Sequence, residues 1–333
     1  MSSNTTLPQS SSQTDQVYTA LYSVLFVVGL MLNSMAAWVF FNLQSRRKTF
    51  ILYLRHMVAA DLLMTLTFLP HILMDAHAGP WWLPAFVCRY SAVLFYVSMY
   101  ASILFLCLLA LDRYLKIVQP FGGSCGACLY SYSFTRLMSV LVWLSMAAMS
   151  LPNSILTNQE PRPETARNCT ALKSEFGLQW HGVVAYINVG IFLVVLVILP
   201  SCYISIYRHI HRSNAQFIIS GEGSKRQRHT QNILVVLVVF SVCFVPYHLW
   251  RIPFTLSQVE DNFSQWTEDI LYHGKTATLF LSSCNVCLDP VIYFLMCASF
   301  RRKLVESLGL KNKLCLNRAN SIKSTQVLRF REY

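Results

Sequence analysis

Four polar side chains in long apolar stretches are the first candidates for chemistry. Asp61 and Asp289 are carboxylic acids in two such stretches, and Asn33 and Asn285 are amides in similar surroundings. A charged side chain inside a membrane costs about 2.5–3.5 kcal/mol on insertion scales, so it indicates a functional site or a paired network. The oxygens of these four residues suit a cation such as Na⁺ with its waters. A structural network in which they satisfy one another is the alternative, and the sequence leaves both open.

The tripeptide Asp112-Arg113-Tyr114 closes another apolar stretch. Adjacent opposite charges at the edge of a membrane attract one another, and breaking that pair exposes the arginine. An ordinary interfacial anchor explains the tripeptide equally well. The motif therefore predicts a switch only if neighbouring motifs support it.

A further cluster is basic and aromatic. His248 and Arg251 are three residues apart, so they share a helix face, and Lys275 begins the next apolar stretch. Tyr96 and Tyr100 are four residues apart. Two cations with His and Tyr groups nearby suit a phosphate-bearing ligand. The alternative is that the two cations pair with carboxylates, for which the candidates are Asp75, Glu260 and Asp261.

Composition shows which elements must position these groups. Of the 333 residues, 54% are hydrophobic and 13% are charged, whereas a globular domain carries roughly 25% charged residues. Seven segments exceed the ~20 apolar residues that cross a bilayer as a helix. The chain is therefore predicted to be an all-α membrane protein, a bundle of seven transmembrane helices. The predicted spans are Tyr18–Leu43, Phe50–Asp75, Ala85–Ile117, Phe134–Leu156, Val183–Tyr207, Asn232–Leu256 and Ile270–Cys297.

The distribution of positive charge predicts the orientation. With the C-terminus in the cytoplasm, six of the 27 Lys and Arg residues lie outside and the other 21 inside, as the positive-inside rule requires. The net charge of +12 is then a feature of topology, and no nucleic acid polymer is expected as a partner. The six outer residues are Arg89, Arg162, Arg167, Lys173, Arg251 and Lys275.

Glycosylation sequons agree with this orientation. The three Asn-X-Ser/Thr sites are Asn4, Asn168 and Asn262, and all three fall in segments predicted to be extracellular. The first residues, Met1 to Gln16, are polar and have no basic region before an apolar run, so we expect the first span to act as the insertion signal.

Two of the eleven cysteines face the oxidising side in this topology. They are Cys88 and Cys169, and we expect them to form a disulfide. Cys125 and Cys128 form a C-x-x-C pair with no second pair nearby, so a loop insertion is favoured over a zinc or redox site, and no metal centre is expected. Cys315 in the basic tail is a weak candidate for palmitoylation.

The loops are too short for a separate catalytic domain, and four regions are expected. Residues 1–17 form a glycosylated extracellular N-terminus, and residues 18–297 form the seven-helix domain. Residues 298–310 alternate Phe300 and Leu304 with basic residues, which predicts an amphipathic helix on the inner membrane surface. Residues 311–333 form a basic cytoplasmic tail.

The motifs in the predicted spans, taken together with their positions, indicate a resemblance to a known family. The motifs are Asn33, Asp61, Asp112-Arg113-Tyr114, Trp143, Phe240-x-x-Cys243-x-x-Pro246 and Asp289-Pro290-x-x-Tyr293, one in each span except the fifth. With the Cys88 and Cys169 pair, the chain resembles the rhodopsin-like G-protein-coupled receptors over nearly its whole length. The resemblance implies a plasma-membrane receptor without enzymatic activity that needs no cofactor beyond a bound Na⁺. Its partners would be a heterotrimeric G protein, arrestin, a receptor kinase and membrane lipid.

Activation follows from the same resemblance. Pro246 removes a backbone hydrogen bond and kinks its helix, whose inner end swings outward when the outer end repacks around a ligand. The resemblance implies that this swing frees Arg113, with Asp289, Pro290 and Tyr293 taking part.

A closer resemblance is to the purinergic nucleotide receptors, in the Gi-coupled branch that senses ADP and UDP-sugars. It is carried by Leu172-Lys173-Ser174-Glu175-Phe176-Gly177, Trp180-His181 and Tyr247-His248-x-x-Arg251-Ile252-Pro253, among other segments. The nearest similarity is to the orphan member of that branch, for which lysophosphatidic acid has been proposed as ligand. The ligand site that the resemblance implies consists of Arg251, His248, Lys275, Tyr96, Tyr100, Asn153, His181 and Cys169.

Three departures from the branch bear on the ligand. The N-terminus and third outer loop lack the cysteines of a second disulfide, Thr276 replaces a usual Glu, and Ala185 replaces a polar Asn. The basic anchors are kept while the polar groups for base and ribose are reduced. A small anionic ligand is therefore expected, either a nucleotide or nucleotide-sugar or, as the alternative, a lysophospholipid.

Other classes fit less well. A retinal pigment needs a Lys deep in the seventh span, but Lys275 lies near its outer end. A transporter or channel predicts duplicated halves or a row of core charges, and neither is evident. An intramembrane enzyme needs a paired nucleophile and base, whereas His209 and His211 lie on different faces. A binding-only decoy is disfavoured by the intact Asp112-Arg113-Tyr114.

Overall fold

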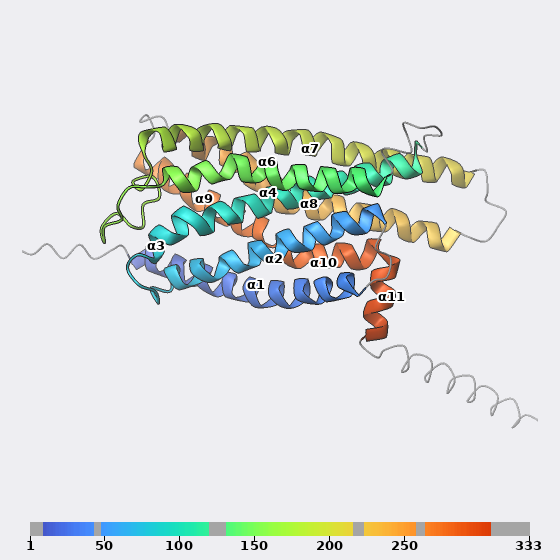
Figure 1. Cartoon of the computed structure of the whole chain (residues 1–333), viewed down its shortest axis with the longest axis horizontal. Coiled ribbons are helices and arrows are strands. Elements are labelled where there is room, and N and C mark those ends of the chain that lie inside the picture. The colour runs from blue at the N-terminus through green and yellow to red at the C-terminus, as the bar shows by residue number, and fades with distance from the viewer. Residues whose placement is uncertain (1–8, 43–47, 120–130, 216–222, 258–263, 308–333) are drawn as a thin grey trace, which may run out of the picture.

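The structure, a computed structural model, describes residues 9–42, 48–119, 131–215, 223–257 and 264–307 (Figure 1). Seven helical stretches within these ranges are long and apolar enough to cross a membrane, which confirms the predicted fold class. Two predicted sequons, the C-x-x-C pair and the tail lie outside the described residues; these are Asn4, Asn262, Cys125, Cys128 and 311–333.

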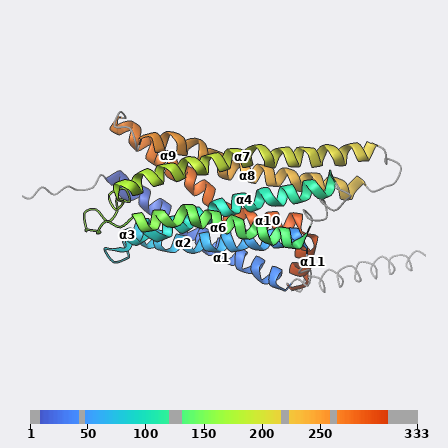
Figure 2. The same ribbon diagram turned by 45° about the horizontal axis from the view of Figure 1, so that its top comes forward.

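The helices follow one another along the chain with short connections. Their bounds are α1 (Gln9–Phe41), α2 (Thr49–Asp75), α3 (Leu83–Phe86), the π-helical turn η1 (Val87–Ser91), α4 (Ala92–Ile117), α6 (Tyr132–Leu156), α7 (Glu175–Ala215), α8 (Gly223–Ser257), α9 (Gln265–Ser283), α10 (Asn285–Met296) and α11 (Ala298–Ser307). The long helices run side by side, and α11 turns across the bundle at one end (Figures 1 and 2). That end is called the α11 end below. The opposite end, which the loop between α6 and α7 covers, is called the disulfide end.

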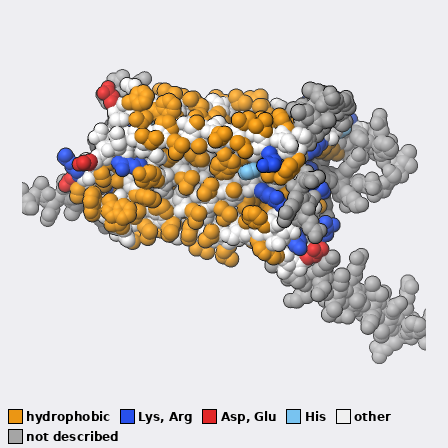
Figure 3. Space-filling view, in the orientation of Figure 1, with side chains coloured by type: hydrophobic (Ala, Val, Ile, Leu, Met, Phe, Trp, Pro, Cys, Tyr) orange, Lys and Arg blue, Asp and Glu red, His pale blue; other side chains and the backbone are white. Residues whose placement is uncertain are grey.

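The helices are apolar on most of their circumference because both sides must be buried, one in the protein and one in lipid. Helix α4 packs against α2, α6 and α7, and so forms the centre of the bundle. Side chains such as Met99, Phe105 and Phe240 fill the interior, whereas Met31, Val197 and Leu249 lie exposed on the outside. The visible face has a broad hydrophobic band with charged side chains gathered toward its two ends (Figure 3).

Two spans are less regular than predicted. The third is one continuous helix that starts with α3, where Pro84 lies in the first turn, and includes the π-helical turn η1 before α4. The seventh is divided at Cys284, whose N–H lies 3.2 Å from the carbonyls of both Phe280 and Leu281, at the junction of α9 and α10. Helices α7 and α8 also extend beyond their apolar cores, since polar turns continue both helices past the hydrocarbon-length segment.

Helix α11 is amphipathic, as the sequence predicts. Phe300 and Leu304 are buried, and the Phe300 ring lies 5.0 Å from that of Phe40 in α1. Arg301 donates to the carbonyls of Phe294 and Leu295 at 3.0 and 2.5 Å, which satisfies the end of α10. These contacts dock α11 against the bundle.

Candidate functional site

A cavity of about 670 Å³ opens into the bundle at the disulfide end. Every spanning helix contributes to its wall, as does the loop between α6 and α7. One lining residue from each of these helices in turn is Tyr22, His71, Tyr96, Asn153, His181, Arg251 and Lys275. The cavity is therefore a pocket between helices, the usual place for a small-molecule site in a bundle.

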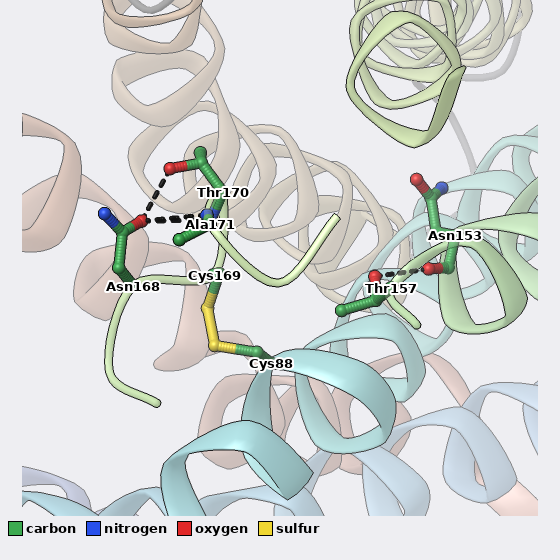
Figure 4. Close-up of a disulfide and its surroundings, with 7 residues drawn as sticks. All are labelled: Cys88, Asn153, Thr157, Asn168, Cys169, Thr170 and Ala171. Atoms are coloured by element: carbon green, nitrogen blue, oxygen red, sulfur yellow. Dashed lines mark hydrogen bonds between the residues drawn. A yellow bond between two sulfur atoms is a disulfide. The ribbon is translucent and has the colours of Figure 1, made fainter. Parts of the chain in front are cut away.

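The predicted disulfide is present and forms part of the cavity wall. Cys88 in η1 is bonded to Cys169 in the loop, with the two Cα atoms 5.3 Å apart (Figure 4). Arg89 Nε donates to the Thr157 carbonyl, and Ser154 Oγ donates to the Arg89 carbonyl at 2.7 Å. These bonds hold the loop across the end of the bundle, so the loop is a fixed wall.

Arg251 is the central cation of the cavity. Only 7% of its surface is exposed, its Nη2 donates to His181 Nε2 at 3.4 Å, and its Cζ lies 5.6 Å from the centroid of Tyr96. Lys275 Nζ lies 5.3 Å from the Phe254 ring centroid. No carboxylate in the described ranges lies within ion-pair distance of either cation, which excludes pairing with Asp75. The other two candidate partners, Glu260 and Asp261, lie outside the described residues.

Lys173 is a third cation on the cavity wall, and it was not among the site residues predicted from the sequence. It is half-buried in the loop, four residues after Cys169. Burial, with the nearby charge of Arg251, lowers the pKa of its ammonium from 10.5 to about 8. The sequence signal that could have identified Lys173 is its position four residues after Cys169, because the predicted disulfide holds that part of the loop against the bundle.

Two predicted site residues from other helices also line the cavity. Asn153 in α6 is 8% exposed, and its buried Oδ1 has no hydrogen-bond partner among the described residues. Tyr96 presents its ring to Arg251 and packs edge-on against Phe95 at 5.3 Å. Both side chains are thus positioned to contact a bound ligand.

His248 does not line the cavity, contrary to the sequence prediction. Its Nδ1 lies 2.8 Å from the Phe244 carbonyl, so Nδ1 carries the proton and donates. Its Nε2 then accepts from the Tyr100 hydroxyl at 3.0 Å, and its ring stacks on Phe192 at 3.7 Å. Both ring nitrogens of His248 are therefore hydrogen-bonded within the protein and its face is stacked on Phe192. Tyr100 lies between the imidazole and the cavity.

The predicted carboxylate pair forms a second polar site, in the middle of the bundle. Tyr293 donates to Asp61 Oδ2 at 2.6 Å, and Ser102 donates to Asp289 Oδ2 at 3.3 Å. Asn33 Nδ2 donates to the Val286 carbonyl at 2.6 Å. The structure therefore brings the polar residues of α1, α2, α4 and α10 together around one interior region.

Several atoms in this region have no partner within the described part of the chain. They are Asn33 Oδ1, Asp61 Oδ1, Ser98 Oγ, Asn285 Oδ1 and Asn285 Nδ2. The four oxygens are hard ligands of the kind a small cation takes. These unpartnered oxygens are available to a small cation, so the residues present fit one. No group of three His, Cys, Asp or Glu side chains with metal-ligand geometry occurs in the described ranges.

The predicted pairing of Asp112 with Arg113 is wrong in this structure. Asp112 Oδ1 lies 2.6 Å from Lys116 Nζ and accepts from Thr49 Oγ1 at 2.8 Å. The Arg113 guanidinium lies over the Phe50 ring, with Cζ 4.3 Å from its centroid. Helical geometry explains the difference, because residues four apart face each other and adjacent residues do not.

The remaining switch residues lie along the interior. Pro246 and Pro290 are inside α8 and α10, where each removes a backbone donor. Ser282 Oγ in α9 donates to the Cys243 carbonyl at 2.7 Å, less than one turn before Pro246. The turn of α8 before Pro246, where the proline interrupts the backbone hydrogen bonds, is therefore hydrogen-bonded to the end of α9.

Comparison with known proteins identifies the family of this chain. A family model described as 7 transmembrane receptor (rhodopsin family) matches residues 32–293. The chain belongs to the rhodopsin family of seven-transmembrane receptors. The motif-based resemblance is thereby confirmed, and the cavity occupies the end of the receptor opposite Asp112 and Arg113.

Similar curated proteins place the receptor in the branch of the purinoceptors. G-protein coupled receptor 87 of Mus musculus is 49% identical over 309 residues, which cover 93% of this chain and 83% of the relative. Purinoceptor 14 of Bos taurus is 44% identical over 306 residues, covering 92% and 89%. Purinoceptor 13 of Rattus norvegicus is 39% identical over 297 residues, covering 89% and 86%.

Members of this receptor family share one general activity. G-protein-coupled receptors bind a small extracellular ligand and act on a G protein, and they are not enzymes. The seven membrane-spanning helices are consistent with a multi-pass plasma-membrane receptor.

Proposed function

We propose that this receptor recognises an extracellular phosphate-bearing ligand, a nucleotide or nucleotide-sugar, and signals through a Gi/o protein. The observation that carries the proposal is the convergence of Arg251, Lys275 and Lys173 on one cavity. No described carboxylate pairs with any of the three. Arg251 is buried and the two lysines are half-buried, so leaving them without a counter-ion is costly, and an anionic ligand removes that cost.

The cavity offers the other contacts that such a ligand needs. Phosphate oxygens would lie between the three cations, because guanidinium and ammonium groups donate charge-assisted hydrogen bonds to them. The Tyr96 ring and the unpaired Asn153 Oδ1 would then contact the organic part. Two of the relatives are named purinoceptors, which agrees with this class of ligand.

The proposal includes an orientation. The disulfide end faces the extracellular space, with residues 1–17 outside and residues 311–333 in the cytoplasm. The excess of Lys and Arg at the α11 end and the sequon at Asn168 support it. Arrestin, a receptor kinase and inner-leaflet lipid would then meet the α11 end, where α11 lies on the membrane surface.

Lysophosphatidic acid is the second candidate ligand. Ala185 and Val184 are buried in α7 and line the cavity beside His181, so an apolar wall adjoins the cations. A phosphate head bound by Arg251 would leave an acyl chain along this wall. The same three cations serve both ligands, so the two candidates differ in what the apolar wall contacts.

We also propose a Na⁺ ion among the unpaired oxygens of Asn33, Asp61, Ser98 and Asn285. The ion would supply positive charge that compensates the carboxylates of Asp61 and Asp289. By holding α1, α2, α4 and α10 together, these residues would favour the inactive arrangement.

Signalling would proceed by a shift in population between two arrangements. A ligand that draws Arg251 toward Lys275 repacks the outer part of α8. Because Pro246 interrupts the hydrogen bonds of α8, the rest of that helix moves as a separate segment. The movement opens the α11 end around Arg113, where the G protein binds.

The experiment measures inhibition of stimulated cAMP in cells that co-express Gi. ADP, UDP, UDP-glucose and lysophosphatidic acid are applied to the wild type and to Arg251→Ala at matched surface expression. Arg162→Ala serves as the control, since Arg162 is exposed in the same loop and outside the cavity. A nucleotide response that Arg251→Ala abolishes and Arg162→Ala retains is the expected result. A response to lysophosphatidic acid alone would favour the second candidate, and equal responses in both variants would refute the cationic site.

A further inference from the structure

One of the predicted glycosylation residues lies on the wall of the ligand cavity. Asn168 lines the cavity together with its neighbours Arg167, Cys169 and Thr170, and all four are exposed to solvent. A residue that both lines a cavity and faces solvent lies at its opening. The loop around Asn168 therefore forms part of the rim of the cavity.

The side chain of Asn168 is held in one orientation. Its Oδ1 accepts from the Thr170 N–H at 3.1 Å, from the Thr170 hydroxyl at 2.5 Å and from the Ala171 N–H at 3.3 Å (Figure 4). The Nδ2 points away from Thr170 and makes no hydrogen bond with any described residue. The oxygen is thus engaged by Thr170 and Ala171, and the nitrogen is the atom left available.

The backbone at Asn168 is fixed on both sides. Arg167 Nη2 donates to the Met74 carbonyl at 3.1 Å and lies 2.8 Å from His77 Nδ1, which ties the loop to the end of α2. Cys169 is bonded to Cys88. The point of attachment on Asn168 is therefore held at the cavity wall, because its neighbours in the chain are anchored to two different elements.

We propose that an N-linked glycan on Asn168 stands at the opening of the cavity and limits the size of what enters from water. The attachment joins Nδ2 to the anomeric carbon of a lipid-linked oligosaccharide, while the bond from that carbon to the lipid diphosphate breaks and the amide loses one proton. A glycan is bulky and solvated. Small phosphate ligands pass beside it, and larger molecules are delayed.

This inference rests on the proposed function in two respects, the extracellular orientation of the disulfide end and the use of this cavity by a ligand. It adds a filter at the opening, which the sequon alone does not imply. Asn4 and Asn262 have the same sequence motif and lie outside the described residues, whereas Asn168 lies on the cavity wall.

The first test measures occupancy in the full-length receptor. Asn4→Gln and Asn262→Gln are combined so that any gel shift on treatment with peptide N-glycosidase comes from Asn168. The shift is expected to persist in Thr170→Ser, which keeps a sequon, and to disappear in Thr170→Ala and in Asn168→Gln. Absence of a shift in the parent would overturn the proposal.

The second test measures access without any assumption about the native ligand. Ala185 is buried and lines the cavity, so Ala185→Cys places a thiol inside it. Intact cells are treated with a small and a large membrane-impermeant thiosulfonate, and labelling of the parent with Ala185 is subtracted. Asn168→Gln and Thr170→Ala are expected to speed labelling by the large reagent several-fold and leave the small reagent unchanged. Thr170→Ser should resemble the parent.

The two proposals fail in different ways. Equal labelling rates by the large reagent in all variants would overturn the filter, whatever the ligand response. A ligand response that Arg251→Ala leaves intact would overturn the proposed function, while the labelling rates would still report the filter. Thr276→Cys repeats the labelling at a second lining position if Ala185→Cys does not reach the surface.

Discussion

The Arg113 guanidinium lies over the ring of Phe50, with Cζ 4.3 Å from the ring centroid, and its buried Nε has no described hydrogen-bond partner. The neighbouring carboxylate of Asp112 is engaged by Lys116 and Thr49. An aromatic ring of α2 therefore holds the arginine that the family resemblance assigns to G-protein coupling. The contact joins α2 to α4 at the end where α11 docks.

Replacing Phe50 is expected to raise basal signalling. Phe50→Leu removes a cation–π contact of about 0.5–2 kcal/mol, which favours release of Arg113. Inhibition of stimulated cAMP without ligand should rise several-fold at matched surface expression. Phe41→Leu is the control, because Phe41 is 78% exposed on the outside of α1. Basal activity that rose equally in both variants would contradict a role for the ring.

Ligand affinity is expected to fall as the pH rises past 8. In the free receptor the pKa of the Lys173 ammonium is about 8, because the group is buried and close to Arg251. A phosphate ligand favours the protonated form, so its affinity is greatest below that pKa and declines above it, by up to about tenfold per pH unit. Binding of the active ligand is measured from pH 7 to 9.

Lys173→Arg provides the matched control for this pH dependence. Arginine stays charged over the whole range, so the variant should lose the decline above pH 8 while keeping the positive charge. Parallel pH profiles for the wild type and Lys173→Arg would show that another group titrates.

Removing one intramembrane charge is expected to abolish any effect of Na⁺ on agonist affinity. Asp61→Asn takes away the carboxylate whose Oδ1 is unpaired beside the oxygens of Asn33 and Asn285. Agonist affinity in the wild type should be lower in sodium buffer than in choline buffer, and the variant should show no difference. Glu268→Gln makes the same chemical change at an exposed position of α9. A sodium effect that survived in Asp61→Asn would place the ion elsewhere or exclude it.

A glycine in α9 is expected to be essential for the packing of Trp250. A Cβ at Gly274 would lie 2.0–2.2 Å from atoms of the Trp250 indole, whose Nε1 donates to the Leu271 carbonyl at 3.0 Å. Gly274→Ala should therefore destabilise the receptor by about 1–3 kcal/mol, the usual cost of overpacking. The melting temperature of the detergent-solubilised receptor reports the loss.

Gly190→Ala is the comparison for this substitution. A Cβ at Gly190 meets nothing within 4 Å, so the melting temperature should stay unchanged or rise. Equal melting temperatures for the two alanine variants would show that Trp250 moves aside without cost.

Residue types and their order along the chain were enough to predict the seven spans, the disulfide and the family. Spans follow from apolar length, which is local to each segment, and Cys88 and Cys169 were the only cysteines left on one side of the predicted topology. Asp61 and Asp289 stood out because carboxylates are rare in such segments. Each of these inferences needs only the residue type and its place along one helix.

Which side chains meet depends on how the helices and the loop pack against one another. Arg251 could be placed on a helix from its spacing, but Lys173 reaches the same cavity because the disulfide draws its loop across the bundle. His248 shares a helix face with Arg251, yet the Tyr100 hydroxyl and the Phe192 ring of two other helices enclose it. The partner of Arg113 is Phe50, which lies 63 residues earlier in the chain. Helix packing sets these contacts, and spacing within one segment cannot encode which residue of another helix lies opposite.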